Sequence, residues 1–149
     1  PPTTTPRASR RQRQMCIRDR YTAAALVSEN KVLAHPACVD SIPTSANKED
    51  HVSMGTIAIR QAREILDNVA HVVAIELLCA AQACDLINSG GQKMRAGKGS
   101  HAAYRIIRRH VPYMERDRDL YRDIETMVSV MRSGAIVEEV EKEVGELRR

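Results

Sequence analysis

The residue types that could do chemistry are concentrated in one short segment of the chain, residues 41–55. Its polar centre consists, in order, of Asn47, Lys48, Glu49, Asp50 and His51. Carboxylates and an imidazole can move protons or bind a cationic group, and an amide can hold either in place. A long apolar segment follows directly, so these groups would lie on a loop held by a rigid helix, as many catalytic and binding groups do. The segment is therefore the first candidate for a functional site.

The element that must position this loop is a long helix predicted over residues 56–87. Apolar side chains recur there every seven residues, in a row made of Ala58, Ile65, Val72, Cys79 and Leu86. Two further apolar rows lie beside the first, so the stripe is too wide for a single neighbouring helix. At 1.5 Å per residue the helix would be about 48 Å long. We expect Asp50 or Ser53 as its N-cap, and a bundle completed by other subunits or by another part of the protein.

The rest of the chain predicts shorter helices and irregular connections. Residues 22–28 are small and apolar, as at the end of a helix, whereas residues 29–48 contain two prolines and predict a loop. Further helices are predicted over residues 100–110 and 117–132, and a charged helix after the break at residues 133–134. No strand is predicted. The fold class is mainly α, with a long bundle helix and a C-terminal helical layer.

Residues 41–55 and the preceding Glu-Asn-Lys-Val-Leu-Ala-His-Pro-Ala segment, residues 29–37, closely resemble the C-terminal part of the aromatic amino acid lyases, and of their histidine-type members in particular. The resemblance extends from about residue 22 to about residue 140. It implies that residues 22–149 form the C-terminal helical part of an ammonia-lyase fold, within a cytoplasmic homotetramer. Histidine-type members eliminate ammonia from L-histidine to give trans-urocanate, the first step of histidine catabolism.

The resemblance also implies a cofactor that this sequence cannot build. The family's electrophile is 4-methylidene-imidazol-5-one (MIO), which forms by autocatalytic cyclisation of an internal Ala-Ser-Gly. No such triplet occurs among the 149 residues. We therefore expect a C-terminal fragment that is inactive by itself.

Glu49 is the residue to which the resemblance assigns a catalytic and substrate-binding role. Histidine-type members carry an acid here and phenylalanine-type members an amide, because an imidazole favours an anionic partner and a phenyl ring does not. The plainer alternative is a solvated loop acid or a charge at the N-terminus of the helix. Lys48 departs from the family, which has Gln there, and its cation could compete with the substrate for the carboxylate. Asp50 and His51 match the family and are expected to be structural, as caps and loop ties, whereas Asn47 and Ser45 are expected to bond the local backbone.

Two other kinds of function stay open at this point. One is a tyrosine or phenylalanine ammonia-lyase or aminomutase of the same family, which Glu49 disfavours. The other is a non-catalytic helical oligomerisation module that binds a partner helix.

Metal sites and disulfides are disfavoured. The spacing of His35, Cys38 and His51 does not fit a tetrahedral site, so no metal is expected. The four cysteines show no framework spacing and are expected to be free thiols in a reducing compartment. Three arginines, Arg105, Arg108 and Arg109, are expected on a solvated face.

Nucleic acid and membrane partners are not expected either. The whole chain has a net charge of +4, and residues 1–20 alone carry +5. The remaining 129 residues therefore carry a net charge of −1. Residues 69–83 form the best apolar run, and a His, a Glu and a Gln interrupt it. The N-terminus lacks the apolar core of a signal peptide, so a cytoplasmic protein is expected.

Residues 1–21 form a separate segment. They are rich in Pro, Thr, Arg and Gln, show no periodicity and predict disorder. Residues 14–20 resemble a translated sequencing-adapter artefact, so we interpret this tail as non-native.

Overall fold

The computed structural model describes residues 10–90 and 96–148, with side chains from Arg20 onward. The elements, in chain order, are α1 (Arg10–Leu33), the 3₁₀ turn η1 (Ala37–Val39), α2 (Gly55–Ser89), α3 (Lys98–His110), α4 (Tyr121–Arg132) and α5 (Ala135–Val144). Within the described ranges the only β pairing is an isolated bridge between Thr44 and Glu49. The mainly α class, with one long helix and a C-terminal helical layer, is confirmed.

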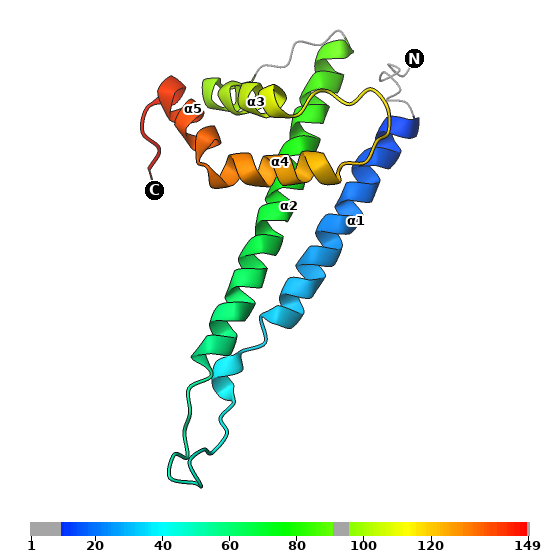
Figure 1. The fold of residues 1–149 in the computed structure, drawn as a ribbon. Helices are drawn as coiled ribbons and strands as arrows, with labels where there is room; N and C mark the ends of the chain where they lie inside the picture. Colours follow the sequence, from blue (N-terminus) through cyan, green and yellow to red (C-terminus); the bar gives the residue numbers. More distant parts are fainter. Residues whose placement is uncertain (1–9, 91–95, 149) are drawn as a thin grey trace, which may run out of the picture.

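Helices α1 and α2 form a long antiparallel hairpin that carries the candidate loop at its tip (Figure 1). The two helices pack along each other, and α3, α4 and α5 form a layer at the opposite end of α2. The Asn68 side-chain amide joins the hairpin arms by donating to Glu29 Oε2 and Asn30 Oδ1, both at 2.9 Å. The loop and the C-terminal layer therefore lie at opposite ends of one rod.

Helix α1 is longer than the sequence predicts at both ends. Disorder was expected through residue 21 and a loop from residue 29, but the helix runs from Arg10 to Leu33. No Pro or Gly lies between Arg7 and Ala34, and Arg, Gln, Met and Ala favour helix. Packing against α2 adds a tertiary contact that periodicity did not reveal. Residues 1–9 lie outside the described part of the chain, and the non-native origin of the tail stays a prediction.

Helix α2 confirms the predicted span, but its predicted cap is wrong. The helix begins at Gly55, with Met54 as N-cap and no capping side chain. Asp50 lies in the loop, four residues too early, and the Ser53 hydroxyl accepts only the Gly55 N–H, at 3.3 Å. The predicted stop is confirmed, since the helix ends at Ser89 and the Gly90 N–H donates to the Leu86 carbonyl at 3.1 Å.

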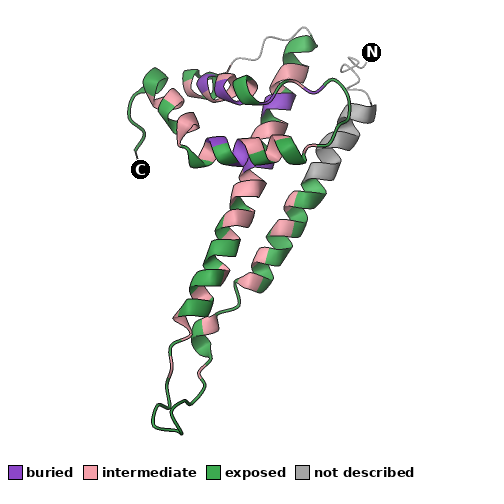
Figure 2. Cartoon of the chain, viewed as in Figure 1, coloured by how far each residue is buried: buried purple, intermediate pink, exposed green. Residues whose placement is uncertain are grey.

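The C-terminal layer holds the core (Figure 2). The buried cluster consists of Ala74, Ala81, Ile106, Ile107, Val111, Met127, Val128 and Val130. Helix α4 begins at Tyr121, later than predicted, where the Asp119 carboxylate accepts the Tyr121 N–H at 3.0 Å. Gly134, at φ 80°, makes the predicted break before α5. α3 packs on α5, and α4 packs across α2.

The rod away from this layer leaves apolar surface uncovered. On α2, Ile59 is 72% exposed and Leu66 is 68% exposed. By length and composition alone α2 could cross a membrane, with a mean hydropathy of 1.6 in its best window, of which 22% is buried. This differs from the sequence expectation, which considered only uninterrupted runs. The core helix of a soluble protein passes the same test, and a bundle completed by other helices stays a prediction.

A histidine ties the middle of α2 to α4. His71 Nδ1 lies 2.7 Å from the Asp67 carbonyl oxygen, and Nε2 lies 2.9 Å from Glu125 Oε1. Both ring nitrogens therefore face acceptors, an arrangement that only the doubly protonated imidazolium satisfies fully. The bond to the Asp67 carbonyl and then the bond to Glu125 raise the pKa of His71, and partial burial and Arg132 oppose the rise.

The resulting pH dependence can be tested with His71→Gln. Because the folded-state pKa is raised above 6.5, the stabilisation is fully present below that value and is lost as pH rises through the folded-state pKa. The difference in unfolding free energy between wild type and variant should therefore shrink above pH 6.5. Denaturant titrations across this range measure it. Glu125→Gln should likewise weaken the pH dependence of the unfolding free energy, because it removes the charged partner of His71. If the difference in unfolding free energy between wild type and His71→Gln grew with pH, the role given to His71 would be wrong.

Candidate functional site

The candidate loop joins η1 to α2 and is held at two points. The Ser41 hydroxyl accepts the Val52 N–H at 2.9 Å, which closes the base of the loop. Further out, Thr44 and Glu49 pair as an antiparallel bridge. The loop therefore narrows to a defined tip at the end of the rod.

The tip is built from three consecutive left-handed residues. Ser45, Ala46 and Asn47 have φ angles of 55°, 55° and 66°. This region disfavours side chains with a Cβ, although Asn tolerates it well. The Lys48 N–H donates to the Ser45 carbonyl at 3.2 Å and closes the turn. A backbone held in a sparsely populated region is common at functional sites, where the surroundings must fix it.

Glu49 lies directly after this turn, and its carboxylate has a partner. The Thr44 hydroxyl donates to Glu49 Oε2 at 2.8 Å. The bond uses Oε2, so Oε1 can accept an N–H from a ligand. Both residues are exposed in this chain, so a ligand or another part of a larger assembly can reach the carboxylate.

The other predicted site residues lie in the same loop, and their contacts differ from one residue to the next. Asn47 supplies a turn conformation, which agrees with the expected structural part. Lys48 contributes its backbone N–H to the turn. Asp50 and His51 are exposed, and neither caps α2, so the capping prediction fails for Asp50. Sequence reasoning missed Thr44, for which the only signal was a hydroxyl five residues before a candidate acid.

The structure gives no support to a metal centre. Among the residues it describes, no group of three or more His, Cys, Asp or Glu side chains could hold an ion. His35, Cys38 and His51, the weak metal candidates, are each exposed.

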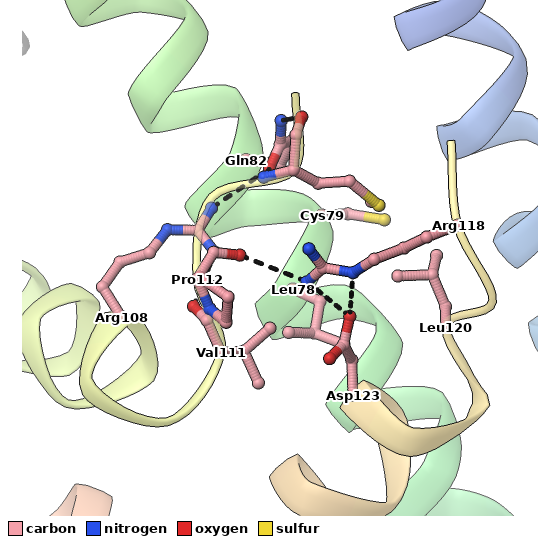
Figure 3. A pocket seen from close by; sticks show the side chains of 10 residues that line it. Leu78, Cys79, Gln82, Arg108, Val111, Pro112, Arg118, Leu120 and Asp123 are labelled. Atoms are coloured by element: carbon pink, nitrogen blue, oxygen red, sulfur yellow. Dashed lines mark hydrogen bonds and ion pairs between the residues drawn. The ribbon is translucent and has the colours of Figure 1, made fainter. Parts of the chain in front are cut away.

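A second candidate is a cavity of about 20 Å³ between α2 and the segment that links α3 to α4 (Figure 3). Its polar lining is already paired. Gln82, buried at 4% exposure, donates to the Met114 carbonyl at 2.9 Å and accepts the Met114 N–H at 3.3 Å. Arg118 binds Asp123 at 2.7 Å. The cavity has room for about one water, and the polar side chains named here already have hydrogen-bond partners. We therefore interpret it as a structural feature and not as a ligand site.

Arg108 lies at this cavity and corrects a sequence expectation. It was assigned to a solvated face, but its side chain is only 14% exposed and pairs with Asp85 at 2.6 Å. The Tyr104 hydroxyl donates to the other oxygen of Asp85, and this bond raises the pKa of Tyr104. Arg105 and Arg109 do face acids of α5, as a solvated face would. Arg108 therefore joins α3 to α2.

Asp85→Asn tests this junction. The substitution leaves a partly buried guanidinium without its counter-ion, which should lower the unfolding free energy by about 2 kcal/mol. Glu143→Gln is the matched control, because it breaks the more exposed pair with Arg105. Denaturant titration of both variants compares them. If both variants lost the same unfolding free energy, the partly buried Arg108–Asp85 pair would contribute no more to stability than the exposed Arg105–Glu143 pair.

Comparisons with known proteins agree with this geometry. The family model described as "Aromatic amino acid lyase" matches residues 7–109. The match begins inside the tail that we interpret as non-native. Because it covers more than half of the 149 residues, the chain belongs to the aromatic amino acid lyase family.

Individual relatives are similar along most of the chain. The histidine ammonia-lyase of Natranaerobius thermophilus is 56% identical over 128 residues, which are 86% of this chain and 24% of that protein. An alignment of this length includes the loop at residues 41–55 wherever it begins. The chain thus spans about a quarter of the length of the curated relatives it matches.

Solved structures give the same fold. The crystal structure of histidine ammonia-lyase from Trypanosoma cruzi superposes with a TM-score of 0.75 at 43% identity, over 83% of this chain and 24% of that one. Tyrosine aminomutase from Streptomyces globisporus superposes with a TM-score of 0.80 at 33% identity, over 89% and 24%. The helical arrangement is therefore that of ammonia-lyases and aminomutases.

Proposed function

We propose that this chain is the C-terminal part of a histidine ammonia-lyase, which eliminates ammonia from L-histidine to give trans-urocanate in histidine catabolism. The 56% identity to a histidine ammonia-lyase over 128 residues, an alignment that spans the loop carrying Glu49, is the observation that carries the proposal. The complete enzyme is proposed to be a cytoplasmic homotetramer. The exposed apolar face of α2 supports an assembly with other helices.

Glu49 is the residue that this chain contributes to catalysis. Its carboxylate stands at the rod tip, where Oε2 is held by Thr44 and Oε1 is available to the imidazole or amino group of histidine. A charged hydrogen bond of this kind orients the substrate and selects against a phenyl ring. The residues that abstract the β-proton lie outside this sequence.

The cofactor MIO would likewise come from outside the 149 residues, which contain no Ala-Ser-Gly. When formed, it supplies the electrophile that makes the amine a leaving group and the β-proton acidic. An exposed carboxylate on a turn fits a place beside such a group, because it can hold the amino group or imidazole of a substrate by charged hydrogen bonds.

The proposed function predicts that the chain alone does not turn over histidine. Purified protein is incubated with L-histidine, and the ultraviolet absorbance of urocanate is followed. The rate should equal that of buffer, because neither the electrophile nor the base is present. Turnover above that background would sink the proposal that these groups lie elsewhere.

A further prediction concerns Glu49 in a complete active site. A chimaera is made in which residues 22–149 replace the matching C-terminal segment of the Natranaerobius thermophilus histidine ammonia-lyase. Glu49→Gln in this chimaera should lower kcat/KM for L-histidine roughly 10- to 100-fold, the cost of losing one charged hydrogen bond.

Asp50→Asn in the same chimaera is the matched control, because it removes the neighbouring charge. It should leave kcat/KM within about threefold of the unsubstituted chimaera, less than one charged hydrogen bond is worth. If Glu49→Gln were as active as that control, the substrate-binding role of Glu49 would be wrong.

A tyrosine-acting enzyme of the same family is the second candidate, supported by the TM-score of 0.80 with tyrosine aminomutase. The acid at position 49 disfavours it. Offering the chimaera L-tyrosine does not decide this, because the rest of the active site would come from a histidine enzyme. The test is the full gene's own product, assayed with both amino acids.

A further inference from the structure

We propose that Thr44 is the positioning residue for the Glu49 carboxylate, and that it sets the affinity for substrate by holding that group in one orientation. The inference rests on the proposed function of Glu49. The structural observation behind the inference is a set of three hydrogen bonds that join Thr44 and Glu49 at the tip of the loop.

The backbones of the two residues are fixed to each other first. The Thr44 N–H donates to the Glu49 carbonyl at 2.9 Å, and the Glu49 N–H donates to the Thr44 carbonyl at 3.3 Å. This reciprocal pair closes the turn of residues 45–48. Three left-handed residues lie inside the turn and reverse the chain, so that Thr44 and Glu49 stand opposite each other as a bridge.

The side chains then add a third bond on top of that frame. Glu49 is exposed, and an exposed Glu would otherwise sample many rotamers, because three side-chain torsions rotate freely. The Thr44 hydroxyl, 2.8 Å from Oε2, selects the rotamers that reach it. Threonine suits this task because its β-branch restricts χ1 and so directs the hydroxyl.

The consequence for substrate binding is one of preorganisation. A carboxylate already held by one oxygen does not lose its rotamer freedom again when the other oxygen binds a ligand. Removing the Thr44 hydroxyl should therefore weaken binding without removing any group that touches the substrate. Thr44 acts through Glu49 and is not itself a catalytic residue.

Thr44→Val in the chimaera tests this inference, because valine keeps the shape and the β-branch and lacks the hydroxyl. The KM for L-histidine should rise about tenfold, within what one hydrogen bond to a charged group is worth. KM is the informative quantity, because partial misfolding lowers the amount of active enzyme, and so the apparent kcat, but leaves KM unchanged.

Two further variants complete the experiment. Thr44→Ser restores a hydroxyl and should bring KM back to within about threefold of the unsubstituted chimaera. Thr56→Val makes the same exchange at an exposed threonine in the first turn of α2, and should leave KM unchanged. An unchanged KM in Thr44→Val, or a Thr44→Ser variant no better than valine, would overturn the inference.

The outcome is separable from that of the proposed function. If Glu49→Gln lowers kcat/KM and Thr44→Val leaves KM unchanged, only the positioning role fails. If Glu49→Gln itself has no effect, the proposed substrate contact fails first, whatever Thr44→Val does.

Discussion

The length of α2 is the constraint on which the rest of the structure depends. Thirty-five residues in one helix separate a polar tip from a packed C-terminal layer, and no second element of the described chain spans both. One end is stabilised by burial of Ala74, Ala81 and the side chains of α3 and α4. Towards the other end only α1 and η1 pack beside α2 among the described elements, so much of its apolar face is exposed.

The polar tip is stabilised by hydrogen bonds, whereas the core is stabilised by apolar packing. A loop cannot hold a carboxylate by apolar packing, so it uses hydrogen bonds that close on themselves. The Thr44–Glu49 pair and the left-handed turn between its members confine the backbone, and the Ser41–Val52 bond confines the base. Because each tie is short in sequence, the tip can keep its geometry although its residues are exposed.

The electrostatic contacts join elements that lie far apart in the sequence. Arg105 of α3 pairs with Glu143 of α5, 38 residues away. Arg108 and His71 bind acids 23 and 54 residues away in sequence. Nothing near either residue in the chain marks it as different from a solvated charge, because its partner is brought to it only by helix packing.

The sequence by itself determined the helical class, the span and stop of α2, the break at Gly134 and the polar loop with Glu49, because periodicity and helix-breaking residues are local signals. Tertiary structure decided the packing of α1 along α2 and the start of α2 without a side-chain cap. It also decided that Thr44 meets Glu49, since a hydroxyl and a carboxylate five residues apart become partners only when the turn between them reverses the chain.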